Sequence, residues 1–321
     1  MNAEFKILIY HPWVIVLFYF CGCAHYSIDS KYHGPEPLPE NIIQEYSYEK
    51  FQGDYTETLT ETQATYQLKK VTFKPTHTIL KDSHEITIDY YDIDKSKKVP
   101  VIMILPILGG KNQESKFFAK YFAKHGYAAI IVNRQKHYKR IDNFDKLDSI
   151  LRQMVFDHKQ VIDWIEMRNE LDASRIGVFG VSMGAIKGAL LCALEPRIKA
   201  SVLALVGGDL PEILSYSVEK GIVKKRNQLM KQHELTLDEF HELLTHKIQC
   251  DPINYAQYIN AKNTLLILAT FDRHVPYNNG IQFKEKVGDP ERIYLCAGHY
   301  TALPYIFYVQ QASLTFFNEH M

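Results

Sequence analysis

The sequence has little of the features that mark several specialised protein classes. Five cysteines among 321 residues are too few for a fold held by disulfide bonds. Neither sign of charge is in excess, since 37 Lys and Arg residues balance 37 Asp and Glu residues, and this excludes the basic surface that nucleic-acid binding requires. Sixteen glycines and 13 prolines are too few for a collagen-like or low-complexity chain. The composition indicates a neutral globular protein that has no nucleic-acid partner and can bury a large core.

Long apolar runs are also scarce near the N-terminus, where the longest uninterrupted one is residues 13–20. A helix needs about 20 apolar residues to span a bilayer, so this run is too short. Its length, after a basic residue at Lys6, is typical of a signal peptide. We therefore predict that residues 1–22 are a signal peptide, with an uncleaved signal anchor as the alternative. In both cases the chain is exported and attached to a membrane.

The end of this segment, Phe20-Cys21-Gly22-Cys23, resembles the lipobox of bacterial lipoproteins. Gly22 is small enough for the signal peptidase to approach the bond before Cys23. The resemblance implies that Cys23 becomes the N-terminus and carries lipid, with palmitate among its acyl chains, which anchors the protein stably. No acidic residue follows Cys23 directly, and by the same resemblance the cell envelope of a Gram-negative bacterium, at its outer membrane, is the expected location.

Residues 23–65 follow, and their polar, Pro-rich part at 34–40 predicts a tether between the membrane and the folded domain. Three further cysteines remain in the domain: Cys192, Cys250 and Cys296. An oxidising compartment permits at most one bridge among them, and the simpler interpretation is that they are small buried hydrophobic residues.

From about Tyr66 onward, strands and helices alternate. Strands at 68–73 and 85–91 alternate polar and apolar residues, whereas nearly continuous apolar runs predict buried strands at 99–105, 128–132, 176–179, 200–206, 264–269 and 292–296. Helical periodicity occupies 113–125, 143–168 and 185–194, and a turn is expected at 172–174. The pattern predicts one α/β domain over 66–321, with a mainly parallel, doubly wound sheet.

One connection is unusually long. Residues 209–263 separate two predicted buried strands and are polar and helix-prone. Because a connection of this length forms structure of its own, we expect a helical cap over the active site.

The chemistry is expected at the ends of strands. Gly180-Val181-Ser182-Met183-Gly184 is a G-x-S-x-G sequence between a buried strand and a helix. Glycines on both sides allow the strained turn that presents a serine nucleophile, and the helix N-terminus favours negative charge beside it. The alternative is an ordinary Gly-rich turn.

Asp272 and His299 each follow a later strand, so the order along the chain is Ser, Asp, His. This order and placement, and the stretch from Asp172 to Gly184, are similar to α/β-hydrolases of the esterase and dienelactone-hydrolase type. The resemblance implies the α/β-hydrolase fold, with Ser182 as nucleophile, His299 as base and Asp272 as the acid that orients it. Asp209, after the preceding strand, is the second candidate for that acid.

The resemblance also implies two backbone donors for the oxyanion. One is Met183, the residue after the nucleophile, and the other belongs to the loop Pro106-Ile107-Leu108-Gly109-Gly110. Ile107 and Leu108 are both candidates there, and Leu108 is preferred.

No cofactor and no metal are predicted. The chain has no nucleotide-binding glycine motif after a strand, and His241 and His246 are five residues apart, too far for two ligands on one helical face. The preferred function is therefore a serine hydrolase that cleaves a small-molecule carboxylic ester. Thioesterase, lipase and serine peptidase activities use the same machinery, and a non-catalytic lipoprotein that binds ligands with this fold is the rival. The sequence leaves the oligomeric state open.

Overall fold

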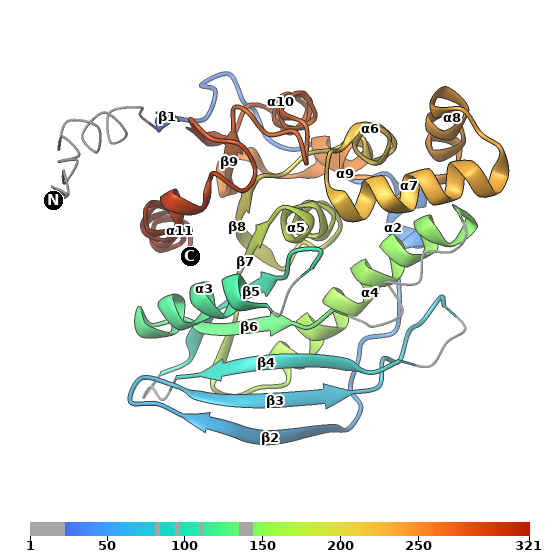
Figure 1. The fold of residues 1–321 in the computed structure, drawn as a ribbon. Helices are drawn as coiled ribbons and strands as arrows, with labels where there is room; N and C mark the ends of the chain where they lie inside the picture. Colours follow the sequence, from blue (N-terminus) through green and yellow to red (C-terminus); the bar gives the residue numbers. More distant parts are fainter. Residues whose placement is uncertain (1–22, 81–83, 94–96, 110–111, 135–143) are drawn as a thin grey trace, which may run out of the picture.

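The computed structural model describes residues 23–321 except 81–83, 94–96, 110–111 and 135–143 (Figure 1). The predicted signal peptide, residues 1–22, lies outside the described residues. The centre of the fold is a ten-stranded sheet in the order β1-β10-β9-β8-β7-β5-β6-β4-β3-β2. The strands are β1 (Ala24–Tyr26), β2 (Tyr55–Thr62), β3 (Gln67–Phe73), β4 (Ile86–Asp92), β5 (Val99–Leu105), β6 (Ala128–Val132), β7 (Leu171–Val181), β8 (Ile198–Ala204), β9 (Thr264–Ala269) and β10 (Glu291–Leu295).

The strands from β10 to β6 are parallel, and antiparallel strands lie at both ends of the sheet. The order reverses at β5, because the chain goes from β5 to β6 on one side and then crosses to β7 on the other. With right-handed crossovers, such a reversal places helices on both faces. The predicted mainly parallel, doubly wound sheet is confirmed, with an antiparallel share that the sequence showed only at β3 and β4.

The helices that accompany the sheet are α2 (Glu40–Glu45), α3 (Gln113–Lys124), α4 (Leu147–Glu166), α5 (Met183–Leu194), α10 (Tyr277–Val287) and α11 (Ile306–His320). Alternate residues of one strand belong to different hydrophobic cores: Val202 packs with α3 and α11, and Leu203 packs with α5 and α10. Since successive strand side chains point to opposite faces, the two cores lie on opposite sides of the sheet.

Several predicted elements differ in length from the observed ones. The strand predicted at 176–179 begins at Leu171 and so includes the predicted turn at 172–174. A local bend remains there, because the Ser174 N–H donates to Asp172 Oδ1 at 3.0 Å, and the pairing of β7 with β5 is irregular at this point. The helix predicted from residue 143 begins as a 3₁₀ turn and becomes α4 at Leu147.

The predicted helical cap lies between β8 and β9. It consists of α6 (Leu210–Tyr216), α7 (Lys220–His233), α8 (Leu237–Lys247) and α9 (Pro252–Tyr255). In Figure 1 these helices lie above α4 and α5. Each of the two long cap helices buries a large side chain, Leu229 in α7 and Phe240 in α8, in the core that α4 and α5 also share. The cap is therefore packed on the domain through apolar contacts.

Residues 23–65 are predicted as a polar tether and N-terminal extension, and parts of this extension are packed on the domain instead of forming a free tether. β1 pairs with β10, β2 pairs with β3, and two aromatic side chains between them, Tyr46 and Phe51, are each only 2% exposed. The polar, Pro-rich sequence at 34–40 is a local property, whereas these aromatic residues contribute burial that holds the whole segment on the domain.

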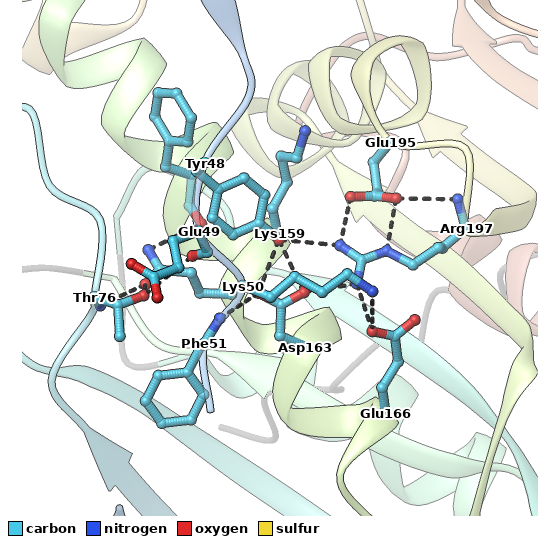
Figure 2. A network of polar contacts seen from close by, with 12 residues as sticks. Tyr48, Glu49, Lys50, Phe51, Thr76, Lys159, Asp163, Glu166, Glu195 and Arg197 are labelled. Atoms are coloured by element: carbon cyan, nitrogen blue, oxygen red, sulfur yellow. Dashed lines mark hydrogen bonds and ion pairs between the residues drawn. The ribbon is translucent and has the colours of Figure 1, made fainter. Parts of the chain in front are cut away.

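A polar network reinforces this attachment (Figure 2). Arg197 donates to Glu195 at 2.7 Å and to Asp163 at 2.6 Å, and the Tyr48 hydroxyl donates to the same Asp163 at 2.8 Å. The backbone N–H of Phe51 also donates to Asp163, at 2.9 Å. Asp163 and Glu195 are almost fully buried, and the network supplies the partners that buried carboxylates require. Residues 48–51 are thus fixed to α4 and to the turn before β8.

Within the described residues, no helix has both the length and the apolar character needed to cross a membrane.

Candidate active site

Ser182 occupies a strained turn between β7 and α5. Its φ is 54° and its ψ is −122°, a backbone conformation that residues with a side chain seldom adopt. The flanking glycines make the turn possible. A Cβ atom at Gly180 would lie 2.4 Å from the Gly184 backbone, and one at Gly184 would lie 1.9 Å from the Leu105 oxygen. The G-x-S-x-G sequence is therefore a requirement of close backbone packing, and it places Ser182 at the carboxyl edge of the sheet.

His299, which is partly exposed, and the buried Asp272 form a pair at the same edge. Asp272 follows β9 and His299 follows β10, and His299 Nδ1 lies 2.6 Å from Asp272 Oδ2. The second oxygen, Oδ1, accepts the backbone N–H groups of His274 at 2.8 Å and Val275 at 3.1 Å. Asp272 is only 6% exposed, so these bonds fix its orientation. A carboxylate at Nδ1 favours the tautomer whose free Nε2 can accept a proton.

Ser182 and His299 both line one cavity of about 1160 Å³. Among the described residues, no hydrogen bond joins Ser182 Oγ to His299. The bond between nucleophile and base is often long in enzymes without substrate and shortens when substrate binds. The cavity lies where the strand order reverses, between β5 and β7, which is the usual ligand position in doubly wound sheets. The cap contributes two kinds of side chain to its lining. The apolar ones are Leu210, Ile213, Leu214, Ile222, Leu229, Phe240, Leu244 and Ile248, and the polar or charged ones are Glu219, Lys224, Lys225, Arg226 and Gln228.

The loop after β5 is held by side chains from three elements. The Lys187 ammonium donates to the Pro106 carbonyl at 2.8 Å, and Arg134 donates to the Ile107 carbonyl at 2.7 Å. The Ile107 N–H donates to the Glu114 carboxylate at 3.4 Å. In a trans peptide the N–H points opposite to the preceding carbonyl. Arg134 therefore fixes the direction of the Leu108 N–H, and Leu108 lines the cavity.

Two buried titratable residues beside this loop were missed by the sequence analysis. Burial, with the nearby Arg134 charge, lowers the pKa of Lys187 to about 7. Burial and the neighbouring Lys187 lower the pKa of His158 to about 4. The sequence carries one signal for Lys187, which is the single charged residue in the apolar helix 185–194.

A contact between the cap and the His299 loop was also missed. The Tyr300 hydroxyl donates to Glu219, just before α7, at 2.5 Å. This bond and burial raise the pKa of Tyr300 to about 12. His274 stacks on His299 with ring centroids 5.2 Å apart. Residues Glu219 and Tyr300 thus link the cap to the loop that carries the predicted base.

Asp209, the second candidate acid, forms other hydrogen bonds. Its side chain accepts the Glu212 N–H at 3.2 Å and caps α6, while its own N–H donates to Asp251. His299 pairs with Asp272 instead.

In the described part of the chain, no group of three or more His, Cys, Asp or Glu residues is arranged to hold a metal ion. Cys23, Cys192, Cys250 and Cys296 are free thiols. Cys250 is buried and accepts a hydrogen bond from Tyr46, in accord with the interpretation as a small core residue, whereas Cys296 is exposed.

Comparisons with known proteins agree with this architecture. The model of the X-Pro dipeptidyl-peptidase (S15) family matches residues 49–273, more than half of the chain. No curated protein sequence matches. An acetyl xylan esterase from Paenibacillus sp. R4 superimposes with a TM-score of 0.64 and 17% identity, over 88% of this chain and 100% of that one. A second acetyl xylan esterase, from a Thermoanaerobacterium species, gives 0.58 and 17%, over 88% and 99%. The acylaminoacyl peptidase of Pyrococcus horikoshii gives 0.57 and 17%, over 80% and 42%.

Fold and site together define an α/β-hydrolase of the serine type, as the sequence resemblance implied. Since the family model covers more than half of it, the chain belongs to the X-Pro dipeptidyl-peptidase (S15) family.

Proposed function

We propose that this protein hydrolyses a small-molecule carboxylic ester through an acyl-enzyme on Ser182. The observation that carries the proposal is the His299–Asp272 pair, held at 2.6 Å in the same cavity as a serine in a strained strand-to-helix turn. A serine hydroxyl is a weak nucleophile until a base removes its proton, and an imidazole oriented by a buried carboxylate is suited to that task.

The mechanism follows from these positions. His299 Nε2 takes the proton from Ser182 Oγ as the oxygen attacks the acyl carbon, and Asp272 stabilises the imidazolium. His299 then returns the proton to the leaving alcohol, which departs and leaves an ester on Ser182. A water molecule, deprotonated by His299, releases the acid and restores the serine.

The oxyanion would be held by the backbone N–H groups of Met183 and Leu108. Between the two loop candidates, geometry favours Leu108, because the Ile107 N–H is already bonded to Glu114. Arg134, through the Ile107 carbonyl, sets the direction of the Leu108 N–H before substrate arrives. Donors fixed in advance require no reorganisation in the transition state.

An ester with an apolar acyl group suits the cavity better than a peptide. Aliphatic and aromatic side chains of the cap, such as Leu229 and Phe240, line part of the cavity and could hold the acyl chain, while charged residues of α7 line another part. In addition, the chain corresponds to essentially the whole of two structures named as acetyl xylan esterases, whereas it spans 42% of the acylaminoacyl peptidase.

Peptide hydrolysis is the second candidate, because the matching family is described as X-Pro dipeptidyl-peptidase. The two are separated by two sets of chromogenic substrates: p-nitrophenyl esters of increasing acyl length, and Xaa-Pro p-nitroanilides. We expect turnover of the esters. Turnover confined to the anilides would assign the peptidase function instead.

The first test is labelling with a fluorophosphonate, read by intact mass. Wild type should gain one adduct, and Ser182→Ala should gain none and lose activity by about 10⁴- to 10⁶-fold while remaining folded. Ser174→Ala, at an exposed serine, is the matched control and should label like wild type. A folded wild type that forms no adduct would support the rival function, a non-catalytic binding lipoprotein.

We further propose that residues 1–22 are removed and that lipid on Cys23 anchors the enzyme in the cell envelope, at the outer membrane of a Gram-negative cell. The lipobox-like sequence before Cys23 supports this. Labelling of expressing bacteria with an alkynyl palmitate should mark wild type and leave Cys23→Ala unmarked. Equal labelling of both proteins would contradict the proposal.

A further inference from the structure

Large apolar side chains are exposed beside the mouth of the cavity. Phe271, Tyr300, Leu303 and Phe307, here called the mouth patch, are each 65–70% exposed. Tyr300 and Leu303 line the cavity itself, and Phe307 stacks edge-on against Phe117 of α3, with ring centroids 5.8 Å apart. Several large apolar side chains exposed on neighbouring loops mark an interaction site.

The N-terminal segment joins the domain at this same edge of the sheet. β1 runs antiparallel to β10, with Ala24 opposite Tyr294, so Cys23 lies at the end of β10 that leads into the His299 loop. Cys23 packs against the core, and burial and the nearby Cys23 thiol raise the pKa of Tyr308, the neighbour of Phe307.

The sequence before Cys23 supplies the second observation. An uncleaved signal anchor would place the apolar run of residues 13–20 three residues before β1, whereas cleavage would place lipid on Cys23, directly before β1. In both cases the membrane attachment lies next to the end of β10 that leads into the His299 loop. The nearby charges include exposed cations, Lys220 and Arg273, and the acidic Glu219 is bonded to Tyr300.

From this arrangement we propose that the mouth patch docks on a lipid bilayer, so that the cavity containing Ser182 opens toward the membrane. An apolar ester would then enter the site from the lipid. The statement about the ester rests on the proposed function, whereas docking does not. Cations at the rim complement the phosphates of anionic headgroups.

Docking is tested with the full chain and a tryptophan reporter. Phe307→Trp is compared with Leu59→Trp, an exposed position on β2 at the other end of the sheet. Both are mixed with phosphatidylcholine–phosphatidylglycerol vesicles whose acyl chains are brominated. The quenching of native tryptophan fluorescence, from Trp164 and from Trp13 where residues 1–22 are retained, is subtracted with the parent chain. We expect at least twofold quenching at residue 307 and none at residue 59. Absence of quenching at both positions would overturn docking.

A functional test uses residues outside the cavity lining. Phe271→Ser/Phe307→Ser should hydrolyse an ester embedded in vesicles at least tenfold more slowly than wild type, with unchanged kcat/KM on p-nitrophenyl acetate. Ile43→Ser/Leu59→Ser, at exposed apolar positions elsewhere, is the control and should match wild type on both. Equal loss on both substrates in the mouth variant would contradict a role at the membrane.

The two proposals fail separately. Quenching at residue 307 without hydrolysis of any ester would leave docking in place and remove the proposed function. The alternative result is a concentration-dependent dimer that Phe271→Ser/Phe307→Ser abolishes, together with no quenching by vesicles. That result would assign the mouth patch to a second copy of the chain and overturn docking on the membrane.

Discussion

The two ends of the parallel strands contain polar groups of different kinds. At the amino end, before β8, Arg197 and the buried carboxylates of Asp163 and Glu195 are fully paired. At the carboxyl end, Ser182 has a strained backbone, and the buried Lys187 amine donates to the Pro106 carbonyl. One end is arranged for stability. The other holds conformations and charges that oppose folding and are kept where the chemistry is proposed to occur.

The largest expected effect is on activity at the carboxyl end. Asp272→Asn should lower kcat/KM by about 10⁴-fold, because His299 loses the carboxylate that sets its tautomer and stabilises its charge. Asp209→Asn is the control, since asparagine preserves the cap of α6. Steady-state kinetics on a p-nitrophenyl ester measure both. A comparable loss in Asp209→Asn would mean that the acid has been assigned to the wrong residue.

The next effect is on stability at the amino end. Arg197→Ala should lower the free energy of unfolding by about 3–5 kcal/mol, because it leaves Asp163 and Glu195 buried without their counter-charge. Urea unfolding followed by circular dichroism measures it.

Arg175→Ala is the matched control for that change. It removes an arginine from the more exposed pair with Asp172, and a loss of about 0–1 kcal/mol is expected. Activity of the folded fraction should be the same in both variants. A reduced kcat in folded Arg197→Ala would show that the two ends are coupled.

The smallest effect concerns pH. The pKa of Lys187 falls from 10.5 to about 7 on folding, so between these values the unfolded chain holds a proton that the folded chain lacks. Stability should therefore rise with pH, by up to about 1.4 kcal/mol per unit from this residue. Lys187→Met should remove that rise.

The difference in slope between wild type and Lys187→Met, measured at pH 7.5 and 8.5, gives the contribution of Lys187, because the buried cysteines titrate alike in both proteins. His158, with its pKa lowered to about 4, is largely neutral in both states there. Lys199→Met removes an exposed lysine that also donates to a backbone carbonyl, and it should retain the wild-type slope. An unchanged slope in Lys187→Met would show that the Lys187 ammonium stays charged inside the protein.

The central fold could be predicted because its strands are buried on both faces. β5, β6 and β9 have the predicted bounds, since continuous apolar runs have a clear start and end. β1 and β2 were not predicted. β1 has three residues, and β2 is an exposed edge strand of mixed polar and apolar residues, so neither carries a strong periodic signal.

The site shows the same division. Ser182, Asp272 and His299 could be placed because each directly follows a strand whose carboxyl end lies at one sheet edge. Arg134 and Glu219 could not, because their contacts with the β5 loop and with Tyr300 exist only after distant segments have packed. The Ile107 and Leu108 alternatives likewise separate only through the tertiary contact with Glu114.

The pairing of β1 with β10 has a consequence for self-association of the chain. β10 would otherwise be the outermost strand, with a row of free backbone donors and acceptors that another chain could join. Ala24–Tyr26 occupies that row, and Tyr26 packs edge-on against Tyr294 with Arg292 over its ring. In a chain shortened past Tyr26, β10 would be an uncovered edge strand with which a second chain could pair. The three residues next to the predicted lipid attachment point therefore also prevent self-association at this edge of the sheet.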